Sequence, residues 1–463
     1  MSITPRPSSR LVQFATCLGF FVVLMDVSVV NVALQALHET MAADVTDLQW
    51  VVNAYALVFA SLLLMAGTLG DRFGARRVFM LGLGVFTLAS IGCSTAPSLE
   101  VLIAWRLLQG LGAALLVPTS LALLQQAFPE PMARNRAVGW WGAAGGIALA
   151  AGPVVGGLLI GTFGWRSLFC INVPIGIVGL WVTWRYALPS PAHKDRSLDI
   201  AGQITGALTL ASFTFALTQA SQSGWSNPVI AGAALMCVLF GVLFLWQQVH
   251  TPQPMLPLGL FRDPTLSSAT VIGLLANLVF YGMVFAFSLF FQSIEHMTPE
   301  QTGLAFLPMM TVLMIMNVLA ARVVRKVGRR CLVTGGLLWS GLGYLLMLPA
   351  LTTQSYGWLV VPMLLAGSGI ALTIPTITSA TLAAVQANQT GIASGMLNAA
   401  RQIGGISGVA LFGFLVRDPA PEAFMRGLNG ALIVSVAVLL LAAGVGFVGM
   451  DRAARRVCTA PGV

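Results

Sequence analysis

Charged residues are scarce in this sequence. They account for 8% of its 463 residues, whereas hydrophobic residues account for 57%. A soluble globular domain carries roughly 25% charged residues. The scarcity of charge therefore excludes a soluble protein and predicts an integral membrane protein.

Residues that build metal sites and disulfides are also few and scattered. The six cysteines contain no C-x-x-C pair, and the four histidines fall between apolar runs without ligand spacing. The sequence contains no G-x-x-x-x-G-K-[S/T] phosphate loop and no recognisable nucleophile triad. It therefore predicts no metal site, no cofactor and no disulfide framework, and argues against an enzyme or an ATP-driven pump.

What the sequence has instead is long apolar runs. About 20 apolar residues in a helix cross a hydrocarbon core of about 30 Å. We expect fourteen such transmembrane helices, the seventh and eighth being the least distinct, at residues 11–34, 49–69, 78–96, 100–124, 137–160, 166–187, 199–220, 228–249, 266–291, 302–323, 332–351, 356–384, 391–416 and 428–449. The first run has full transmembrane length and no convincing cleavage site, so we expect it to be retained.

The positive charges between the runs predict the orientation. With the N-terminus inside, the outer segments hold only Arg166, Arg417 and Arg426, while the inner segments hold nearly all other Lys and Arg. Cytoplasmic loops of membrane proteins carry such an excess. We therefore expect both termini in the cytoplasm of a multi-pass cell-membrane protein, and we read the net charge of +9 as a topology signal, so that nucleic acid is not an expected partner.

The runs fall into a six-plus-two-plus-six pattern. Six precede the segment HKDRS at 193–197, six follow Pro257, and two lie between. This plan predicts an N-terminal six-helix bundle (1–192), two extra helices with their linkers (193–257) and a C-terminal six-helix bundle (258–463), with a pathway at the interface of the bundles.

Asp26 is the single charge in the first apolar run. A carboxylate at the centre of a span costs at least ~2.5 kcal/mol on insertion scales, so it points to a proton, cation or substrate pathway. The alternative is an acid near the end of the span that reaches interfacial water.

The segment GTLGDRFGARR, from Gly67 to Arg77, follows the second run. Its glycines allow a tight turn and close helix contact, and Asp71 can cap the next helix or pair with a neighbouring arginine. The segment resembles the signature loop of the major facilitator superfamily, G-x-L-x-D-R-x-G-R-K/R, with Ala75 in place of the first basic residue. The resemblance implies a cytoplasmic gating loop formed by Gly67, Asp71, Arg72, Gly74, Arg76 and Arg77. An ordinary basic turn is the alternative.

The second half carries an incomplete copy of this loop, ARVVRKVGRR, from Ala321 to Arg330. Gly328, Arg329 and Arg330 match, but Arg325 stands where the acid is expected. We therefore expect the first-half loop to do most of the gating.

Two segments inside the runs resemble further motifs of this superfamily. RLLQGLGAA, from Arg106 to Ala114, is similar to the fourth-span motif R-x-x-Q-G-x-G-A-A, which implies a role for Arg106 in proton coupling and places Gln109 in the cavity. A buried guanidinium needs a partner, either Asp26 or a backbone carbonyl, unless Arg106 reaches the outer interface.

The fifth run contains GGIALAAGPVVGG, which resembles the antiporter motif G-x-x-x-G-P-x-x-G-G without its first glycine. Small residues permit tight helix crossing and proline permits a bend. The residues that carry this antiporter motif are Gly145, Gly152, Pro153, Gly156 and Gly157. A generic small-residue helix contact is the alternative.

Three further segments narrow the resemblance to the fourteen-span drug:proton antiporter family. LMDVSVVNVAL (24–34) is similar to L-D-x-T-V-V-N-V-A-L, GWRSLFCINVP (164–174) to W-R-W-I-F-x-I-N-x-P, and NAARQIGG (398–405) to N-x-x-R-Q-x-G-G. In the first, Met25 is additional and Ser28 keeps the hydroxyl of the usual threonine. The resemblance implies the major facilitator fold: two six-helix bundles plus an inserted two-helix hairpin.

An antiporter requires a group whose proton affinity differs between its two states. Desolvation raises the proton affinity of a buried carboxylate, and a nearby cation lowers it. We therefore predict that Asp26 takes up a proton from outside and releases it inside, with Arg106 approaching or leaving it.

Polar and aromatic residues near mid-span predict the substrate cavity. The candidates are Asn31, Gln109, Asn277, Tyr281, Phe285, Asn317, Asn398 and Arg401, with Phe280, Phe306, Met309 and Met310 beside them. Because only Asp26 is a clear intramembrane carboxylate, a site for dications is disfavoured.

The sequence therefore predicts proton-coupled efflux of hydrophobic or cationic toxic compounds, with a drug-like small molecule, protons and the lipid bilayer as partners. Accessory efflux proteins are not predictable from it. An exporter of one specific metabolite or antibiotic is the alternative, and a non-transporting membrane receptor is disfavoured by the intact motifs.

Overall fold

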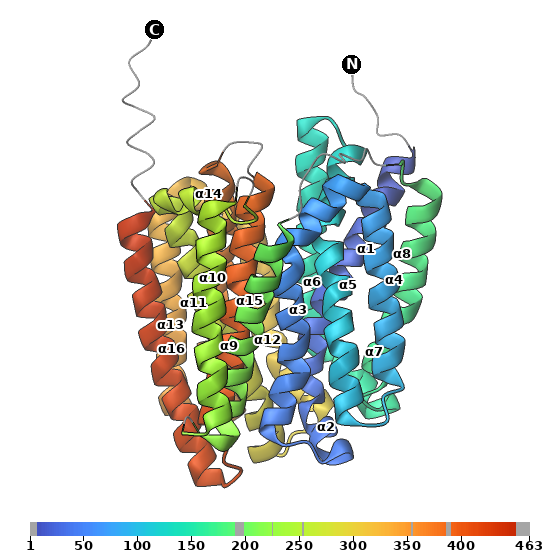
Figure 1. The fold of residues 1–463 in the computed structure, drawn as a ribbon. Coiled ribbons are helices and arrows are strands. Elements are labelled where there is room, and N and C mark those ends of the chain that lie inside the picture. Colours follow the sequence, from blue (N-terminus) through green and yellow to red (C-terminus); the bar gives the residue numbers. More distant parts are fainter. Residues whose placement is uncertain are drawn as a thin grey trace. The chain divides into compact units, whose positions relative to one another are not determined.

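The computed structural model describes residues 7–189, 199–224, 226–251, 254–352, 355–385 and 390–450, and every regular element within them is helical (Figure 1). The expectation of an all-helical protein is thus confirmed. The elements are α1 (Pro7–Val29), η1 (Val30–Ala33), α2 (Leu34–Met41), α3 (Val45–Phe73), α4 (Ala75–Ser94), α5 (Leu99–Ala127), α6 (Pro131–Phe163), α7 (Ser167–Cys170), α8 (Asn172–Tyr186), α9 (Ile200–Ser223), α10 (Pro228–His250), η2 (Leu258–Arg262), α11 (Pro264–Leu289), η3 (Phe290–Ile294), α12 (Pro299–Val327), α13 (Arg329–Thr352), α14 (Tyr356–Ala383), α15 (Thr390–Leu415) and α16 (Pro421–Gly449).

Local sequence signals explain where these helices begin and end. At the start of α3, the Asp44 carboxylate accepts from the Asp47 N–H at 2.8 Å, and the Asp47 carboxylate accepts from the Asp44 N–H at 3.0 Å. This reciprocal pair satisfies two backbone donors that a helix start leaves free. Proline, which lacks the N–H that would be orphaned there, occupies the first position of α6, α10 and α16.

By length and hydropathy, twelve helices in the described part of the chain can cross a membrane. A thirteenth is counted if the two parts of α6, Arg136–Leu149 and Ala151–Phe163, which meet at 42°, form one span. The expected fourteen are not reached, because α15 is not among these helices. Its 26 residues include Asn398, Arg401 and Gln402, which lower its hydropathy.

The chain forms two compact units. Unit 1 comprises residues 1–213, 234–244 and 288–305, and unit 2 comprises 214–233, 245–287 and 306–463. The predicted boundary segment at 193–197 lies outside the described residues, so the three-part division by sequence remains a prediction.

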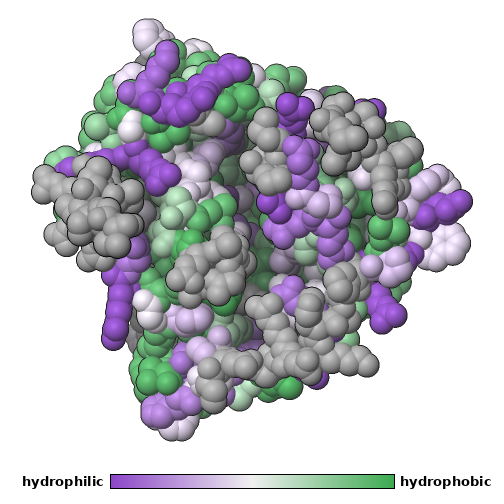
Figure 2. All heavy atoms as spheres, turned by 90° about the horizontal axis from the view of Figure 1, so that it is seen from above, coloured by the Kyte–Doolittle hydropathy of each residue, from purple (hydrophilic) through white to green (hydrophobic). Residues whose placement is uncertain are grey.

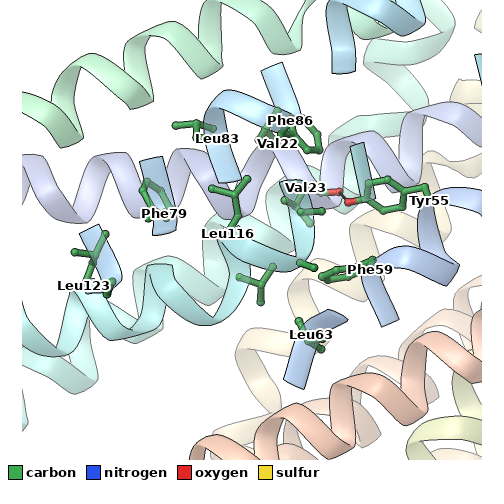
Figure 3. Close-up of a cluster of buried hydrophobic side chains, with 14 of the residues drawn as sticks. Val22, Val23, Tyr55, Phe59, Leu63, Phe79, Leu83, Phe86, Leu116 and Leu123 are labelled. Carbon is green, nitrogen blue, oxygen red and sulfur yellow. Dashed lines mark hydrogen bonds between the residues drawn. The ribbon is translucent and has the colours of Figure 1, made fainter. Parts of the chain in front are cut away.

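The core of unit 1 is apolar and involves α1, α3, α4 and α5. Its fully buried side chains include Val22, Tyr55, Phe79, Phe86 and Leu116 (Figure 3). The helices approach closely because glycines lie at the crossings: a Cβ on Gly112 of α5 would lie 2.6 Å from the Phe86 backbone nitrogen of α4. In unit 2, α13 packs against both α14 and α16.

The outward surface of the helices is apolar, as expected for contact with lipid. On α10, Leu235, Val238 and Val249 are each more than 60% exposed. Hydrophilic side chains gather instead at the helix ends seen in Figure 2, the end at which the turn between α3 and α4 also lies (Figure 1). Apolar helix sides, with hydrophilic residues at a helix end, are the pattern that membrane-spanning helices require.

Candidate functional site

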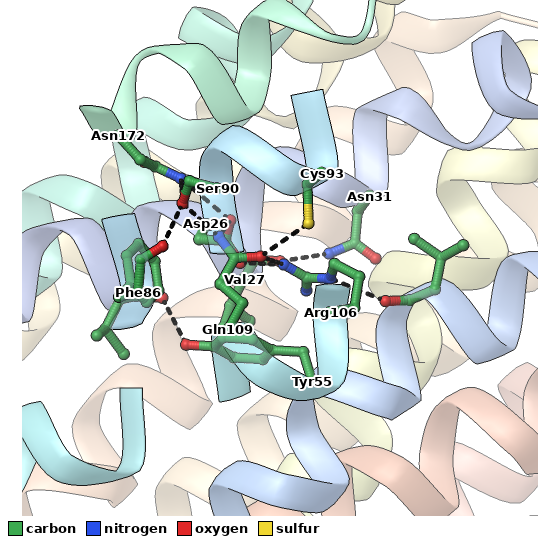
Figure 4. A network of polar contacts seen from close by, with 12 residues as sticks. Asp26, Val27, Asn31, Tyr55, Phe86, Ser90, Cys93, Arg106, Gln109 and Asn172 are labelled. Carbon is green, nitrogen blue, oxygen red and sulfur yellow. Dashed lines mark hydrogen bonds and ion pairs between the residues drawn. The ribbon is translucent and has the colours of Figure 1, made fainter. Parts of the chain in front are cut away.

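Asp26 lies inside unit 1, on α1, and is fully buried. Its Oδ2 atom forms an ion pair with Nη1 of Arg106, which α5 supplies and which is 1% exposed (Figure 4). A buried guanidinium stays charged and needs such a partner. Of the alternatives left open by the sequence, the structure therefore excludes an Asp26 or Arg106 that reaches interfacial water.

Gln109 is the centre of the network around this ion pair. Its Nε2 donates to Oδ1 of Asp26 at 2.8 Å, and its Oε1 accepts from Nη1 of Arg106 at 2.7 Å. Nε2 also donates to the Ser90 hydroxyl at 3.0 Å, and the Cys93 thiol lies 3.6 Å from Oε1. Because Gln109 follows Arg106 by three residues, both project from the same face of α5. Gln109 was expected to line a cavity, but it is completely buried in this network.

Asn172 and Ser90 complete the site, and sequence reasoning did not predict a role for either. Asn172 Nδ2 donates to Oδ1 of Asp26 at 3.3 Å and to the Ser90 hydroxyl at 3.4 Å. Its buried Oδ1 has no hydrogen-bond partner. The I-N-x-P match was a usable signal for Asn172, whereas nothing distinguished Ser90 from other helix hydroxyls.

Backbone and aromatic groups hold the other side of Arg106. Its Nε donates to the Val51 carbonyl at 3.1 Å, so the guanidinium has both predicted kinds of partner, a carboxylate and a carbonyl. Its Cζ lies 4.5 Å from the ring centroid of Tyr55 and 5.9 Å from that of Phe169. A ring face attracts a cation, so these contacts stabilise the charge in an apolar setting.

The hydrogen-bond directions define the chemical state of Asp26. Its partners Arg106, Gln109 and Asn172 all present N–H donors. Carboxylates accept from such donors, whereas a carboxylic acid needs an acceptor for its proton. The arrangement is that of an ionised Asp26. Protonation would remove the charge that balances Arg106.

Pro153 connects this site to α6. A proline inside a helix has no N–H for the carbonyl four residues earlier, which here is the carbonyl of Leu149. That carbonyl accepts instead from the Ser28 hydroxyl at 2.9 Å, two residues after Asp26 on α1. The hydroxyl that Ser28 shares with the family's threonine therefore satisfies the backbone group freed by the motif's proline.

The glycines of the antiporter motif bring α6 against α1. A Cβ on Gly145 would lie 2.3 Å from the Phe20 ring. A Cβ on Gly152 would lie 2.5 Å from the Ser28 hydroxyl, and a Cβ on Gly156 would lie 2.5 Å from Val29 Cγ2. Any larger residue would push the helices apart.

Further glycines bring α6 against the first turns of α12. A Cβ on Gly157 would lie 2.5 Å from the Pro299 carbonyl oxygen, and one on Gly303 would lie 2.2 Å from the Pro153 carbonyl oxygen. The motif thus has two packing faces within unit 1, of which the face toward α12 was not foreseen from the sequence.

Most of the predicted gating loop is helical. Gly67, Asp71 and Arg72 lie on α3, and Arg76 and Arg77 lie on α4, so that a single residue separates the two helices. Gly74 joins α3 to α4 with φ of 92°, which side chains disfavour, and a Cβ on Gly70 would lie 2.9 Å from Thr119. No side chain caps the start of α4, so Asp71 does not serve as its cap. Arg76 donates to the Trp184 carbonyl at 2.5 Å at the end of α8, Arg72 lies over the Phe73 ring, and Arg77 is exposed.

The second-half copy has the same geometry: Gly328, with φ of 82°, joins α12 to α13, and the guanidinium carbon of Arg330 lies 3.7 Å from the Phe447 ring centroid. A glycine with positive φ thus joins the two helices in both halves, and the role of these segments as gates remains a prediction.

The other cavity candidates differ in burial. Asn31 is buried and donates to the Val27 carbonyl, while Asn277 is buried and donates to the Gly273 carbonyl. Phe285, Phe306, Met309 and Met310 are buried as well. The candidates that keep some exposure are Tyr281, Asn317, Asn398 and Arg401.

Residues 16–409 of the chain match the protein family described as Major Facilitator Superfamily. The chain is 37% identical to the methylenomycin A resistance protein of Streptomyces coelicolor over 404 residues, which cover 87% of this chain and 85% of that protein. It is also 37% identical to the multidrug resistance protein Stp of Mycobacterium tuberculosis over 407 residues, covering 87% of this chain and 75% of that protein.

Among solved structures, the chain is similar to a D-xylose-proton symporter. The TM-score is 0.70 at 15% sequence identity, and the match covers 96% of this chain and 98% of that one. At this identity the likeness is one of fold.

Proposed function

This chain belongs to the Major Facilitator Superfamily, and on that basis we propose that it exports hydrophobic toxic compounds across the cell membrane in exchange for protons. The family consists of transporters, so the chain is a multi-pass membrane transporter and not an enzyme. Export of drugs is supported by relatives that are named as resistance proteins. The match with this chain covers most of the length of each of them.

Proton coupling is supported by one observation above all, the buried ion pair of Asp26 and Arg106. In the arrangement described, Asp26 is ionised and Arg106 is bound to it. Protonation of Asp26 breaks this pair and leaves a buried guanidinium that must find other partners, which favours a different packing of α1 and α5. A proton can drive transport only if its affinity differs between two such states.

The role of α6 in this mechanism follows from its contacts with α1. Gly152 and Gly156 pack against Ser28 and Val29, which follow Asp26 on α1, and the Ser28 hydroxyl donates to the Leu149 carbonyl. A shift of α1 on protonation is therefore transmitted to α6 directly. We propose that the turn at Gly74 gates the cytoplasmic side, as the family resemblance implies.

Export of a single antibiotic is the second candidate function. It is supported by the name of the Streptomyces relative, which refers to a single compound. Cationic substrates, expected from the sequence, remain a prediction for either function.

We also propose that α6 and α15 each span the membrane, giving fourteen spans with both termini cytoplasmic, and that α9 and α10 form a hairpin between the N-terminal bundle (1–192) and the C-terminal bundle (258–463). Both α9 and α10 are long and apolar enough to span. Near the start of α9, Gln203 donates to the Ser61 carbonyl of α3 at 2.6 Å, which joins this helix to the N-terminal bundle.

Reporter fusions test the hairpin. Alkaline phosphatase needs disulfides that form outside the cytoplasm. We expect activity when it is fused after residue 224, between α9 and α10, and none when it is fused after residue 254. Equal activity of the two fusions would exclude a hairpin that crosses the membrane.

Everted vesicles test the reaction. We expect vesicles that contain the protein to accumulate several compounds from a panel of hydrophobic dyes and drugs, with uptake falling to the level of empty vesicles when an uncoupler collapses the proton gradient. Acceptance of a single compound would favour the dedicated exporter. Uptake that an uncoupler leaves unchanged would contradict proton exchange.

A further inference from the structure

Arg401 of unit 2 is a second arginine inside a long helix, and unlike Arg106 it forms no ion pair with a described carboxylate. It lies in the middle of α15, about 15 Å or more from either end of the helix at about 1.5 Å per residue. Its hydrogen bond to a side chain runs from Nη1 to Oδ1 of Asn398 at 3.3 Å, and its buried Nε atom has no partner. A guanidinium has five N–H donors and remains charged, so most of its capacity is unused.

The described acids of unit 2 are all occupied at helix ends. Asp263 Oδ1 caps α11 by accepting from the Thr265 and Leu266 N–H groups. Asp418 accepts from the Ala420 N–H, and Glu422 faces Arg426 at 4.0 Å. None of these described acids forms an ion pair with Arg401. Among the described residues of unit 2, no carboxylate therefore compensates the positive charge in the middle of α15.

The packing of α15 against α11 fixes the surroundings of Arg401. A Cβ on Gly404 would lie 2.0 Å from the Leu274 carbonyl oxygen, and one on Gly408 would lie 2.0 Å from the Leu278 carbonyl oxygen, so the two backbones are in contact. Tyr281 of α11 consequently lies against Gly405, one turn along α15 from Arg401. Tyr281 carries a hydroxyl, which can serve as a second donor to a ligand of Arg401.

The neighbouring groups make this place suitable for an amphipathic ligand. Arg401, Tyr281 and Asn398 are partly exposed, whereas Phe280 and Leu397 beside them are buried and apolar. Phe280 and Tyr281 meet edge to face with centroids 5.2 Å apart. In such low-dielectric surroundings an unpaired charge attracts an opposite charge strongly.

We infer that Arg401, held by Asn398 and assisted by the Tyr281 hydroxyl, binds the carboxylate of a hydrophobic acid that the protein exports. The inference rests on the proposed export function and changes its substrate class. A cation would be repelled by the charge of Arg401, and Asp26, the one buried carboxylate among the described residues of unit 1, is already neutralised by Arg106. A planar carboxylate matches the donor fork of an arginine.

Binding to the purified full-length protein in lipid nanodiscs tests the inference. The probes are dansylglycine, an anion at neutral pH, and dansylglycine amide, which is neutral and has the same fluorophore. A charge-assisted hydrogen bond favours the acid over the amide by about tenfold to a hundredfold in Kd. We expect this preference in the wild type, its loss in Arg401→Gln with amide binding unchanged, and partial retention in Arg401→Lys.

Arg426→Gln is the matched control, because it removes the same charge from an exposed position in unit 2. It should keep the full preference. Equal affinity of the wild type for acid and amide, or an unchanged preference in Arg401→Gln, would overturn the inference. If Arg401→Gln does not fold, Arg401→Lys and Tyr281→Phe decide, since both keep the charge but weaken the carboxylate contact and should lower the preference.

Transport separates this inference from the proposed function. Uncoupler-insensitive uptake in vesicles, together with an Arg401-dependent preference for the acid in nanodiscs, would reject proton-driven export and keep the carboxylate site. Uncoupler-sensitive uptake of neutral dyes, together with no preference for the acid in nanodiscs, would keep proton-driven export and reject the carboxylate site.

Discussion

Replacing Asp26 with asparagine is expected to reduce proton-driven uptake into everted vesicles to the level of empty vesicles. Asparagine has the shape of aspartate and can still accept from Gln109 and Asn172 through its Oδ1, but it cannot take up and release a proton. The variant also leaves Arg106 buried without a counter-ion, which costs about 3–5 kcal/mol when one partner of a buried pair is removed. We therefore expect a lower thermal stability in detergent as well.

A double variant separates these two effects. Asp26→Asn combined with Arg106→Gln removes both charges and retains groups that can hydrogen-bond to Gln109. We expect it to recover most of the stability lost in the single variant while remaining inactive. Asp418→Asn, which neutralises an exposed carboxylate, is the control and should behave as the wild type. Full proton-driven export by Asp26→Asn would refute the proposed role of Asp26.

The sequence predicted the centre of this site because charge is rare in apolar helices. Asp26 and Arg106 stand out for that reason, and Gln109 follows Arg106 on the same helix face. Ser90 and Tyr55 could not be identified in this way, because neither is charged: the Ser90 hydroxyl also bonds to the Phe86 carbonyl of its own helix, and the Tyr55 hydroxyl donates to the Val23 carbonyl of α1. Their positions near the ion pair depend on how α3 and α4 pack against α5, and this packing cannot be predicted from a local sequence pattern.

The backbone carbonyl groups that bond to Arg106 and Ser28 were also not identified from the sequence. The Val51 carbonyl binds Arg106, and the Leu149 carbonyl binds Ser28, yet carbonyl groups belong to every residue. For Leu149 a signal was available, because Pro153 necessarily frees the carbonyl four residues before it. The number of spans is hard to predict from the sequence for a related reason. Polar residues lower the hydropathy of α15, so that it is not counted as a span, although one of them is Arg401, the cation in the middle of this helix of unit 2.

The second large effect is expected where α6 meets α12. Gly157→Leu should abolish export and lower stability, since even its Cβ would lie 2.5 Å from the Pro299 carbonyl oxygen and 2.9 Å from Glu300 Cα. These are backbone atoms, so the strain cannot be relieved by rotating a side chain. Overpacking of this kind costs about 1–3 kcal/mol or more. The measurements are vesicle uptake and the temperature at which the protein aggregates in detergent.

Two other glycines of α6 serve as graded controls for Gly157. A Cβ on Gly161 would meet the Glu300 carboxylate, the far end of a flexible side chain, so Gly161→Ala should cost little. A Cβ on Gly146 has no atom within 4 Å, and Gly146→Leu should leave both stability and export near wild type. If Gly157→Leu and Gly146→Leu behave alike, α6 does not depend on this contact. If only Gly157→Leu loses export while remaining folded, the close approach of α6 to α12 is required for the transport cycle itself.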